Sequence, residues 1–172
     1  MSTTPSPPTQ HTKTRFLVIS DTHSSNPSQN TNNEAPYRPP LPKADVLLHC
    51  GDLTMLGHLD EYERTLDMLQ TIDAGLKLVI AGNHDISLDE QYYKRMGRHM
   101  QGKRYDADLP SKARELWMGE RARKAGVTYL DEGSHDFVLR NGARLRVYAS
   151  PYQPEFCVRV NVGCGEVCNA NR

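Results

Sequence analysis

The chain has 172 residues, which suffices for one domain with a substantial core and is too short to expect two. Lys plus Arg and Asp plus Glu are balanced at 21 each, so no overall charge favours nucleic acid or an anionic membrane. No apolar stretch approaches the roughly 20 residues that span a bilayer, and the first residues contain no apolar signal-peptide core. We therefore expect a cytoplasmic protein without a membrane span and without specific nucleic-acid binding.

Composition divides the chain into three parts. Residues 1–14 are rich in Ser, Thr, Pro and Gln and are predicted to be disordered. Residues 15–156 carry the apolar and amphipathic segments of one folded domain. Residues 157–172 form an atypical tail that holds three of the four cysteines. Cys164 and Cys168 could form half of a zinc site, but no second half follows, so the cysteines favour a reduced compartment instead.

Three apolar runs in the first half of the chain predict strands. Residues 14–20 form a run typical of a strand buried on both faces, and residues 24–43 after it predict a long, partly disordered loop. Residues 45–50 and 76–81 are the second and third runs, each stopped by a glycine. Between these two runs an amphipathic helix is expected, with an apolar stripe formed by Leu59, Tyr62, Leu66 and Leu69.

Two helices are expected in the middle of the chain. Ser87 followed by Glu90 has the form of a capping box and predicts a helix that runs toward Arg98. Residues 109–124 predict a second, charged helix.

The last third of the domain predicts extended structure. Residues 127–130 favour a strand. Asn141-Gly142, between residues 136–139 and 143–150, is typical of the turn of an antiparallel hairpin. Together the elements indicate an α/β fold with a mixed, α+β second half.

Polar clusters at the ends of the three early strands predict a single site. They are Asp21-Thr22-His23, Gly51-Asp52 and Gly82-Asn83-His84-Asp85. Ligands of open α/β sheets bind at the carboxyl ends of the strands, so the clusters are expected to face one pocket. Each cluster alone is compatible with an ordinary turn or strand exit, whereas three in succession favour a shared function.

The residue types in these clusters suit a pair of divalent cations. Carboxylates and imidazoles bind Mn, Fe or Zn, and one carboxylate can bridge two cations roughly 3.5–4 Å apart. We expect Asp21 and His23 to bind the first metal and Asp52 to bridge both. The neutral amide of Asn83 then adds a ligand to the second metal. His84 is expected to protonate the leaving oxygen after attack by metal-activated water, so His84 and Asp52 are the predicted catalytic residues.

These motifs resemble the opening motifs of the calcineurin-like metallophosphoesterases. The segment from Gly51-Asp52-Leu53-Thr54 through Gly57 is similar to the branch of metallophosphoesterase-domain-containing proteins, and the resemblance spans about residues 15–156. It implies a β-sandwich flanked by helices, a dinuclear centre and the metal-binding roles given above. The family's later His and its closing Gly-His-x-His have no match here, so we expect a domain that is incomplete at its C-terminus.

Two functions from different classes follow. The first is a metal-dependent phosphoesterase that hydrolyses a phosphomonoester or phosphodiester, with a small phosphate ester or a nucleotide as substrate. The alternative is a truncated, catalytically impaired paralogue that acts as a binding module or is a non-functional fragment. The missing histidines are the feature that separates them.

Other polar residues near the clusters are weaker candidates. His49 is interpreted as a hydrogen-bonded core imidazole, and His58 as a surface residue that opens a helix. Arg98, Lys103 and Arg104 could form an anion-binding rim, although a basic run is usually solvated.

Overall fold

The computed structural model describes residues 12–25 and 40–152. The predicted N-terminal disorder, most of the predicted loop at 24–43 and the tail at 157–172 lie outside these residues. The elements in chain order are β1 (Phe16–Ile19), β2 (Ala44–Cys50), α1 (Leu59–Thr71), β3 (Ala74–Ile80), the 3-10 helix η1 (Ile86–Leu88), α2 (Glu90–Gln101), the 3-10 helix η2 (Gly102–Arg104), α3 (Leu109–Met118), α4 (Glu120–Lys124), β4 (Val127–Tyr129), β5 (Gly133–Val138) and β6 (Arg144–Ala149). Among the described residues, no helix combines the length and the apolarity that crossing a bilayer requires.

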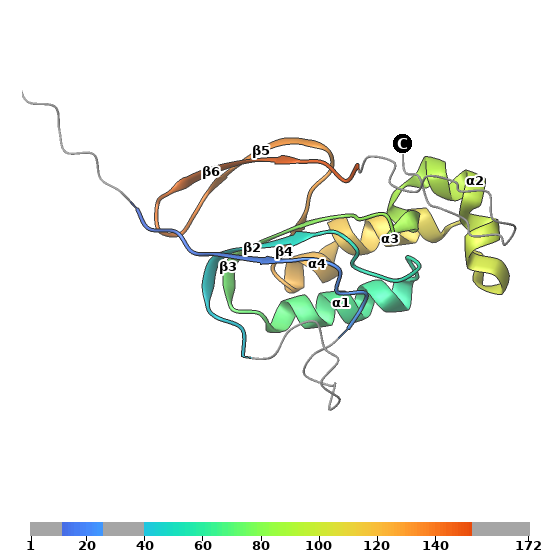
Figure 1. Ribbon diagram of the computed structural model, residues 1–172, viewed down its shortest axis with the longest axis horizontal. Helices are drawn as coiled ribbons and strands as arrows, with labels where there is room; N and C mark the ends of the chain where they lie inside the picture. Colours follow the sequence, from blue (N-terminus) through green and yellow to red (C-terminus); the bar gives the residue numbers. More distant parts are fainter. Residues whose placement is uncertain (1–11, 26–39, 153–172) are drawn as a thin grey trace, which may run out of the picture.

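A parallel sheet forms the centre of the molecule. Its strands lie in the order β1-β2-β3-β4, and β5 and β6 pair antiparallel in a second sheet. The hairpin of β5 and β6 covers one face of the parallel sheet, and helices α1, α3 and α4 cover the other (Figure 1). This arrangement confirms the predicted mixed α/β architecture of strands packed in two sheets and flanked by helices.

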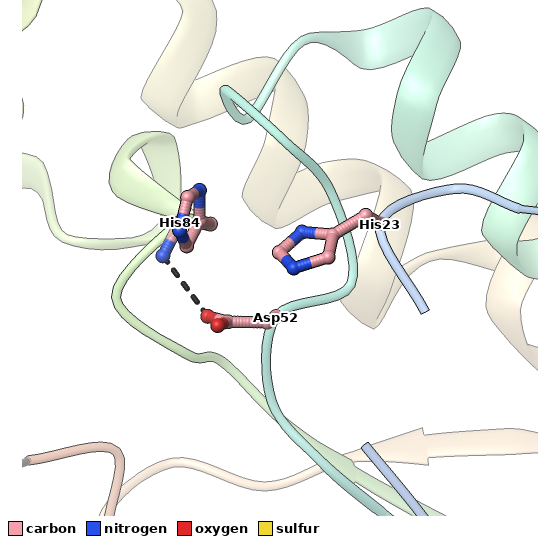
Figure 2. A group of neighbouring side chains, drawn as sticks. All are labelled: His23, Asp52 and His84. Carbon is pink, nitrogen blue, oxygen red and sulfur yellow. Dashed lines mark hydrogen bonds between the residues drawn. The ribbon is translucent and has the colours of Figure 1, made fainter. Parts of the chain in front are cut away.

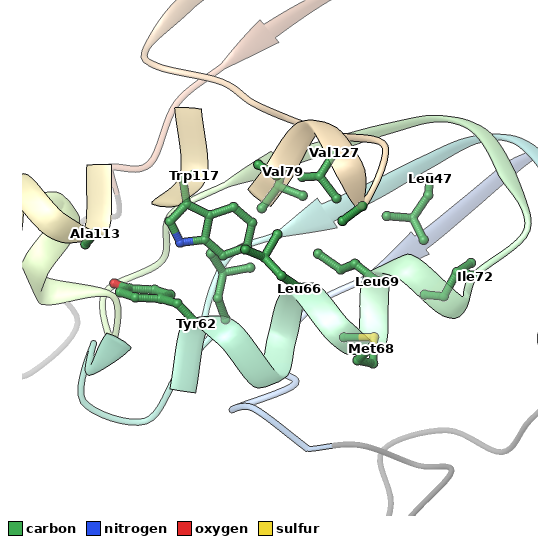
Figure 3. Close-up of a cluster of buried hydrophobic side chains, with 13 residues drawn as sticks. Leu47, Tyr62, Leu66, Met68, Leu69, Ile72, Val79, Ala113, Trp117 and Val127 are labelled. Carbon is green, nitrogen blue, oxygen red and sulfur yellow. The ribbon is translucent and has the colours of Figure 1, made fainter. Parts of the chain in front are cut away.

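Alternation along the central strands divides the core into two halves. Leu47 and Val79 point to the helix side, where they pack with α1 and with Trp117 of α3 (Figure 3). Val46 and Leu78, one residue earlier in each strand, point to the hairpin side. Successive side chains of a strand face opposite sides of the sheet, so apolar residues at neighbouring positions satisfy both layers.

The first strand differs from the prediction that it is buried on both faces. Within the described residues, β1 lies at the edge of the parallel sheet and pairs with β2. Leu17 and Ile19 pack against the helix-side core, but Phe16 and Val18 are 47% and 58% exposed on the opposite face. The described part of the hairpin does not reach across β1, and an apolar run of four residues cannot reveal from its own composition which neighbours will cover it.

Two helix boundaries also differ from the predictions. The helix expected to begin at Ser87 is α2, and its N-cap is Asp89, whose Oδ1 accepts a hydrogen bond from the Tyr92 amide at 2.8 Å. Ser87 instead donates to the Gly57 carbonyl oxygen at 2.7 Å. The capping-box interpretation was therefore wrong, because tertiary contacts use the Ser87 hydroxyl.

The single helix predicted over residues 109–124 is two helices that meet at Gly119. Gly119 has an extended backbone, and a Cβ at this position would collide with the carbonyl oxygen of Glu115. The close approach of the chain to its own preceding turn requires glycine, and it separates α3 from α4.

Lys77 joins two helix ends beneath the sheet. Its side chain lies inside the helix-side layer at 6% exposure, and its Nζ donates to the carbonyl oxygens of Leu69 at 2.7 Å, Ala125 at 3.2 Å and Gln70 at 3.4 Å. These carbonyls lie at the ends of α1 and α4, where helices leave their last acceptors without intrahelical donors. One ammonium group therefore caps both helices.

Replacing Lys77 by Met is expected to lower the free energy of unfolding by about 2 kcal/mol. Hydrogen bonds to a charged group are worth about 1.5–3 kcal/mol, and methionine keeps the packing while leaving the carbonyls unpaired. Urea denaturation measures the change. Lys112→Met is the matched control, because Lys112 makes one exposed ion pair with Asp106 and its loss should cost less than about 1 kcal/mol. Equal costs for the two variants would contradict the capping role.

Candidate metal centre

Two histidines and one carboxylate meet at the carboxyl end of the parallel sheet. His23 follows β1, Asp52 follows β2 and His84 follows β3, and one potential ligand atom of each lies within 4.8 Å of the others. Figure 2 shows the three side chains around a common space. The two imidazole rings are 4.8 Å apart between centroids and stand edge to face. The predicted convergence of three strand ends is thus present for these residues.

Backbone carbonyls fix the orientation of both imidazoles. Nδ1 of His23 lies 2.9 Å from the carbonyl oxygen of Thr54, and Nδ1 of His84 lies 2.8 Å from that of Met55. A carbonyl oxygen only accepts, so each Nδ1 carries the proton and each Nε2 keeps a lone pair. Metal-ligating histidines usually donate their second ring nitrogen to such an acceptor. The loop after β2 therefore prepares both rings for a cation.

The Asp52 carboxylate is held between the loops that follow β2 and β3. Its Oδ1 accepts a hydrogen bond from the His84 amide at 3.1 Å, shown as a dashed line in Figure 2. Gly82 packs so closely against it that a Cβ at position 82 would collide with the Asp52 amide and Oδ1. Asp52 is 8% exposed, so its carboxylate is buried at the floor of the group. Glycine at position 82 is a steric requirement of this site.

Unusual backbone conformations are concentrated at the site. Asp21, His23, Ser24 and Asp52 have φ angles of 55°, 45°, 61° and 51°, and they are the only described residues other than glycine with positive φ. Such conformations are uncommon and cost free energy, and they cluster at functional sites. The loop after β1 is held against the loop after β2 by two backbone hydrogen bonds. The Asp21 amide donates to the Gly51 carbonyl oxygen, and the His23 amide donates to the Asp52 carbonyl oxygen, both at 3.1 Å.

The buried side chain of Asp85 connects the loop after β2 to the loop after β3. Its carboxylate accepts from the Leu53 amide at 3.0 Å, from the Gly82 amide at 2.8 Å, and from the amide and hydroxyl of Thr54 at 2.9 and 2.7 Å. Burial raises the pKa of Asp85, these hydrogen bonds partly offset that rise, and the resulting pKa is about 6. At pH 7 Asp85 is therefore a carboxylate with four donors. The sequence cluster contained Asp85, but its supporting role was not anticipated.

The remaining predicted ligands, Asp21 and Asn83, are close in sequence to His23 and His84 of this group. Asp21 precedes the turn that carries His23, and its exposed carboxylate accepts a hydrogen bond from the Ser20 hydroxyl. Asn83 precedes His84 in the same turn at half-buried depth. Neither position tests the ligand roles of Asp21 and Asn83, which stay predictions. His84, expected only as a proton donor, is placed by the geometry where it could also be a ligand.

The weaker candidates take structural positions. His49 is 1% exposed and its Nε2 lies 2.8 Å from the Thr22 hydroxyl, which confirms a hydrogen-bonded core imidazole. His58 does open α1, but it is buried at 6% exposure and not on the surface as expected. The backbone amide of His58 donates a hydrogen bond to the Glu61 carboxylate at 2.9 Å. The residue at the start of α1 is therefore part of the interior.

The proposed basic rim is occupied by other contacts. Arg104 forms an ion pair with Asp60 at 2.5 Å. Arg98 lies over the ring of Tyr105, 4.6 Å from its centroid. These contacts favour the interpretation of a solvated basic surface over that of an anion-binding rim.

The donor set fits a divalent transition metal. Two imidazoles and a carboxylate are ligands that Zn, Mn and Fe share. Bonds of about 2.1 Å place two ligands at most about 4.2 Å apart, so closing the group around one ion requires movements of about half an ångström. The hydrogen bond from the His84 amide uses Oδ1 of Asp52, so Oδ2 is the oxygen that can bind a cation.

The fold and the site define an α/β protein whose sheet edge could hold a metal. A family model described as calcineurin-like phosphoesterase matches residues 14–152. The chain belongs to the calcineurin-like phosphoesterase family. This membership supports phosphate-ester hydrolysis in general, and divalent metals are typical of the family.

Several curated proteins share the domain. The chain is 30% identical over 144 residues to human metallophosphoesterase domain-containing protein 1, which corresponds to 83% of this chain and 39% of that protein. It is 34% identical over 104 residues to the Caenorhabditis elegans UPF0046 protein K07C11.7, covering 60% of this chain and 30% of that protein. A protein of Emericella nidulans named probable rhamnogalacturonate lyase C is 31% identical over 141 residues, covering 82% of this chain and 11% of that protein. The chain thus spans well under half the length of these relatives.

Proposed function

We propose that the chain is a metal-dependent phosphoesterase that hydrolyses a small phosphomonoester or phosphodiester, such as a nucleotide. The observation that carries the proposal is the meeting of His23, Asp52 and His84 at the carboxyl end of the sheet. The proposed ligands are Asp21 and His23 for one divalent cation, Asn83 for a second, and Asp52 between them. Cytoplasmic location, the identity of the metal (Mn, Fe or Zn) and the absence of nucleic-acid binding stay predictions from the sequence.

Charge makes this group suitable for a phosphate ester. Asp21 and Asp52 are the two carboxylates among the proposed ligands, while the imidazole of His23 and the amide of Asn83 are neutral when they act as ligands. Two divalent cations exceed the charge of two carboxylates, so the site stays electropositive and attracts an anionic ester. When bound, such cations lower the pKa of water to near neutrality and stabilise charge on the attacking and leaving oxygens.

The chain's own residues orient and protonate the substrate's leaving oxygen. The Nδ1 proton of His84 is directed at the Met55 carbonyl, so Nε2 is the atom that delivers a proton when the ring is in its imidazolium form. Its amide is fixed to Asp52, which keeps the donor beside the carboxylate. These contacts support His84 as the proposed general acid.

A neighbouring cavity favours a small substrate. It has a volume of about 390 Å³ and its lining includes Gly82 and Asp85 from the loop after β3, together with Tyr129 and Tyr152. Cavities of roughly 300–1,000 Å³ are typical of small-ligand sites. The loop that carries His84 therefore borders a space of suitable size for a small ligand, and the charged side chains that line it are one cation and several carboxylates: Arg95, Asp85, Asp89, Glu90, Asp131 and Glu132.

Hydrolysis of bis(4-nitrophenyl) phosphate and 4-nitrophenyl phosphate, followed by release of nitrophenolate, tests the proposal. The protein purified with Mn²⁺ is expected to hydrolyse at least one ester, to lose this activity on removal of metal by a chelator, and to regain it with Mn²⁺. Activity that survives complete metal removal would contradict the metal dependence. Mn²⁺ binding without hydrolysis of either ester would favour the alternative, a catalytically impaired paralogue that acts as a binding module.

His84→Ala is expected to lower kcat about 100-fold with a smaller change in KM, because general acid catalysis contributes about 10²-fold or more. Steady-state kinetics with the better of the two esters measures both constants. His99→Ala is the matched control, since His99 is exposed on α2 away from the group and its loss should leave kcat unchanged. Equal rates for the two variants would remove His84 from the mechanism.

A further inference from the structure

His49 is a polar residue in an otherwise apolar part of β2. Its side chain points to the helix side of the sheet, as does Leu47 two residues earlier, and it is 1% exposed. Its Nδ1 has no hydrogen-bond partner among the described residues. A buried polar atom without a partner costs about 1–3 kcal/mol, so an apolar side chain would suit this position better if stability alone mattered.

The hydrogen bond that His49 does make leads to the metal group. Its Nε2 lies 2.8 Å from Oγ1 of Thr22, the residue between Asp21 and His23. Thr22 is 1% exposed, whereas Asp21 is exposed and His23 is half-buried. Fixing the Thr22 side chain in the interior therefore turns its two neighbours toward the outer edge of the sheet, where His23 meets Asp52.

The turn around Thr22 needs such a fixed point because its conformation is strained. Asp21, His23 and Ser24 have φ angles of 55°, 45° and 61°, a region that costs of order 1–3 kcal/mol per residue. Amide hydrogen bonds to the loop after β2 hold these three residues. Thr22 has the inward side chain of the turn, and its hydroxyl forms a hydrogen bond with the imidazole of His49.

We infer that His49 is a positioning residue for the metal group: through Thr22 it holds the turn that presents His23 to Asp52. The inference rests on the proposed function for its metal, but the positioning itself is a property of the metal-free protein. His49 contacts neither substrate nor cation in this role. It acts on the site from the helix side of the sheet.

The test is the double variant His49→Leu/Thr22→Val, which removes both hydrogen-bonding groups and keeps the volume close to that of the native pair. Replacing both partners by apolar groups can be nearly neutral for stability. We expect the free energy of unfolding to stay within about 1 kcal/mol of the wild-type value or to rise. Mn²⁺ affinity, measured by titration calorimetry, is expected to fall about 10- to 100-fold, the loss typical of residues that support ligands.

Hydrogen exchange of the metal-free protein gives a second readout. The His23 and Ser24 amides donate to the Asp52 and Leu53 carbonyls at 3.1 and 2.8 Å, and their protection is expected to fall at least about 10-fold in the double variant. Thr22→Ser keeps the hydroxyl and should retain both protection and affinity. Met68→Ala, a core change in α1 remote from the turn, controls for a general loss of stability.

The outcomes separate the two claims. Native protection of the His23 and Ser24 amides in the double variant would overturn the positioning role. The positioning role would also be overturned if Met68→Ala lost the same protection at these two amides at the same free energy of unfolding. Failure of the wild-type protein to bind Mn²⁺ would overturn the proposed metal centre, while a selective loss of protection in the double variant would still support His49 as the residue that holds the turn.

Discussion

Asp52→Asn is expected to reduce Mn²⁺-dependent hydrolysis about 1,000-fold without unfolding the protein. The carboxylate is the only acidic group among the three side chains that converge, and it is 8% exposed. An amide of the same shape cannot supply its negative charge to a cation. Loss of one group that stabilises charge in the transition state costs about 10²- to 10³-fold, and Asp52 also serves as the proposed bridging ligand.

The asparagine variant is chosen because it preserves the surrounding structure. Position 52 has φ = 51°, a conformation that Asn tolerates well, and the amide oxygen can still accept the hydrogen bond from the His84 amide. Circular dichroism and urea denaturation should therefore match the wild-type protein. Asp136→Asn is the matched control, since Asp136 forms an exposed ion pair with Arg146 on the hairpin and its loss costs little. Hydrolysis by Asp52→Asn at the rate of this control would mean that the activity does not arise at this site.

The position of the site could be predicted from sequence because strand ends carry strong local signals. Each apolar run that forms β1, β2 or β3 is followed by the polar cluster that contributes to the group. In a parallel sheet these ends necessarily lie at the same edge, so a one-dimensional pattern was enough to bring His23, Asp52 and His84 together. No property of the individual loops was required.

The supporting structure of the site could not be predicted in the same way. The carbonyls of Thr54 and Met55 that orient the histidines belong to residues whose side chains give no hint of this use. The four donors to Asp85 come from residues 53, 54 and 82, which only the folded chain brings together. Contacts of this kind depend on the relative position of loops that are about 30 residues apart in sequence.

The predictions of helix boundaries and of the burial of β1 were wrong for a related reason. Serine is a favourable N-cap residue, but the Ser87 hydroxyl donates its hydrogen bond to the carbonyl oxygen of Gly57 in another loop. The break at Gly119 depends on its contact with Glu115, and the exposure of Phe16 depends on the extent of the hairpin across the sheet. Local propensity describes what a segment can form, and these tertiary contacts decide where it ends.

Asp85→Ala is expected to lower the free energy of unfolding by about 4 kcal/mol or more. It leaves four donors without an acceptor in a fully buried position: the amides of Leu53, Thr54 and Gly82 and the Thr54 hydroxyl. Each buried unpaired donor costs about 1–3 kcal/mol, and water entering the vacated space recovers only part of this. Losses of this size are exceptional for single substitutions and indicate that a polar network has been broken.

Urea denaturation of three variants tests whether Asp85 joins the loops. Asp85→Asn keeps one acceptor oxygen and should cost less than Asp85→Ala, which also provides a measurement if the alanine variant does not fold. Asp89→Ala removes a half-buried carboxylate with a single cap hydrogen bond, so its cost should be about 1 kcal/mol. If Asp85→Ala costs no more than Asp89→Ala, the four hydrogen bonds contribute little net stability. The loops after β2 and β3 would then have to be held together by packing, such as that of Gly82 against Asp52.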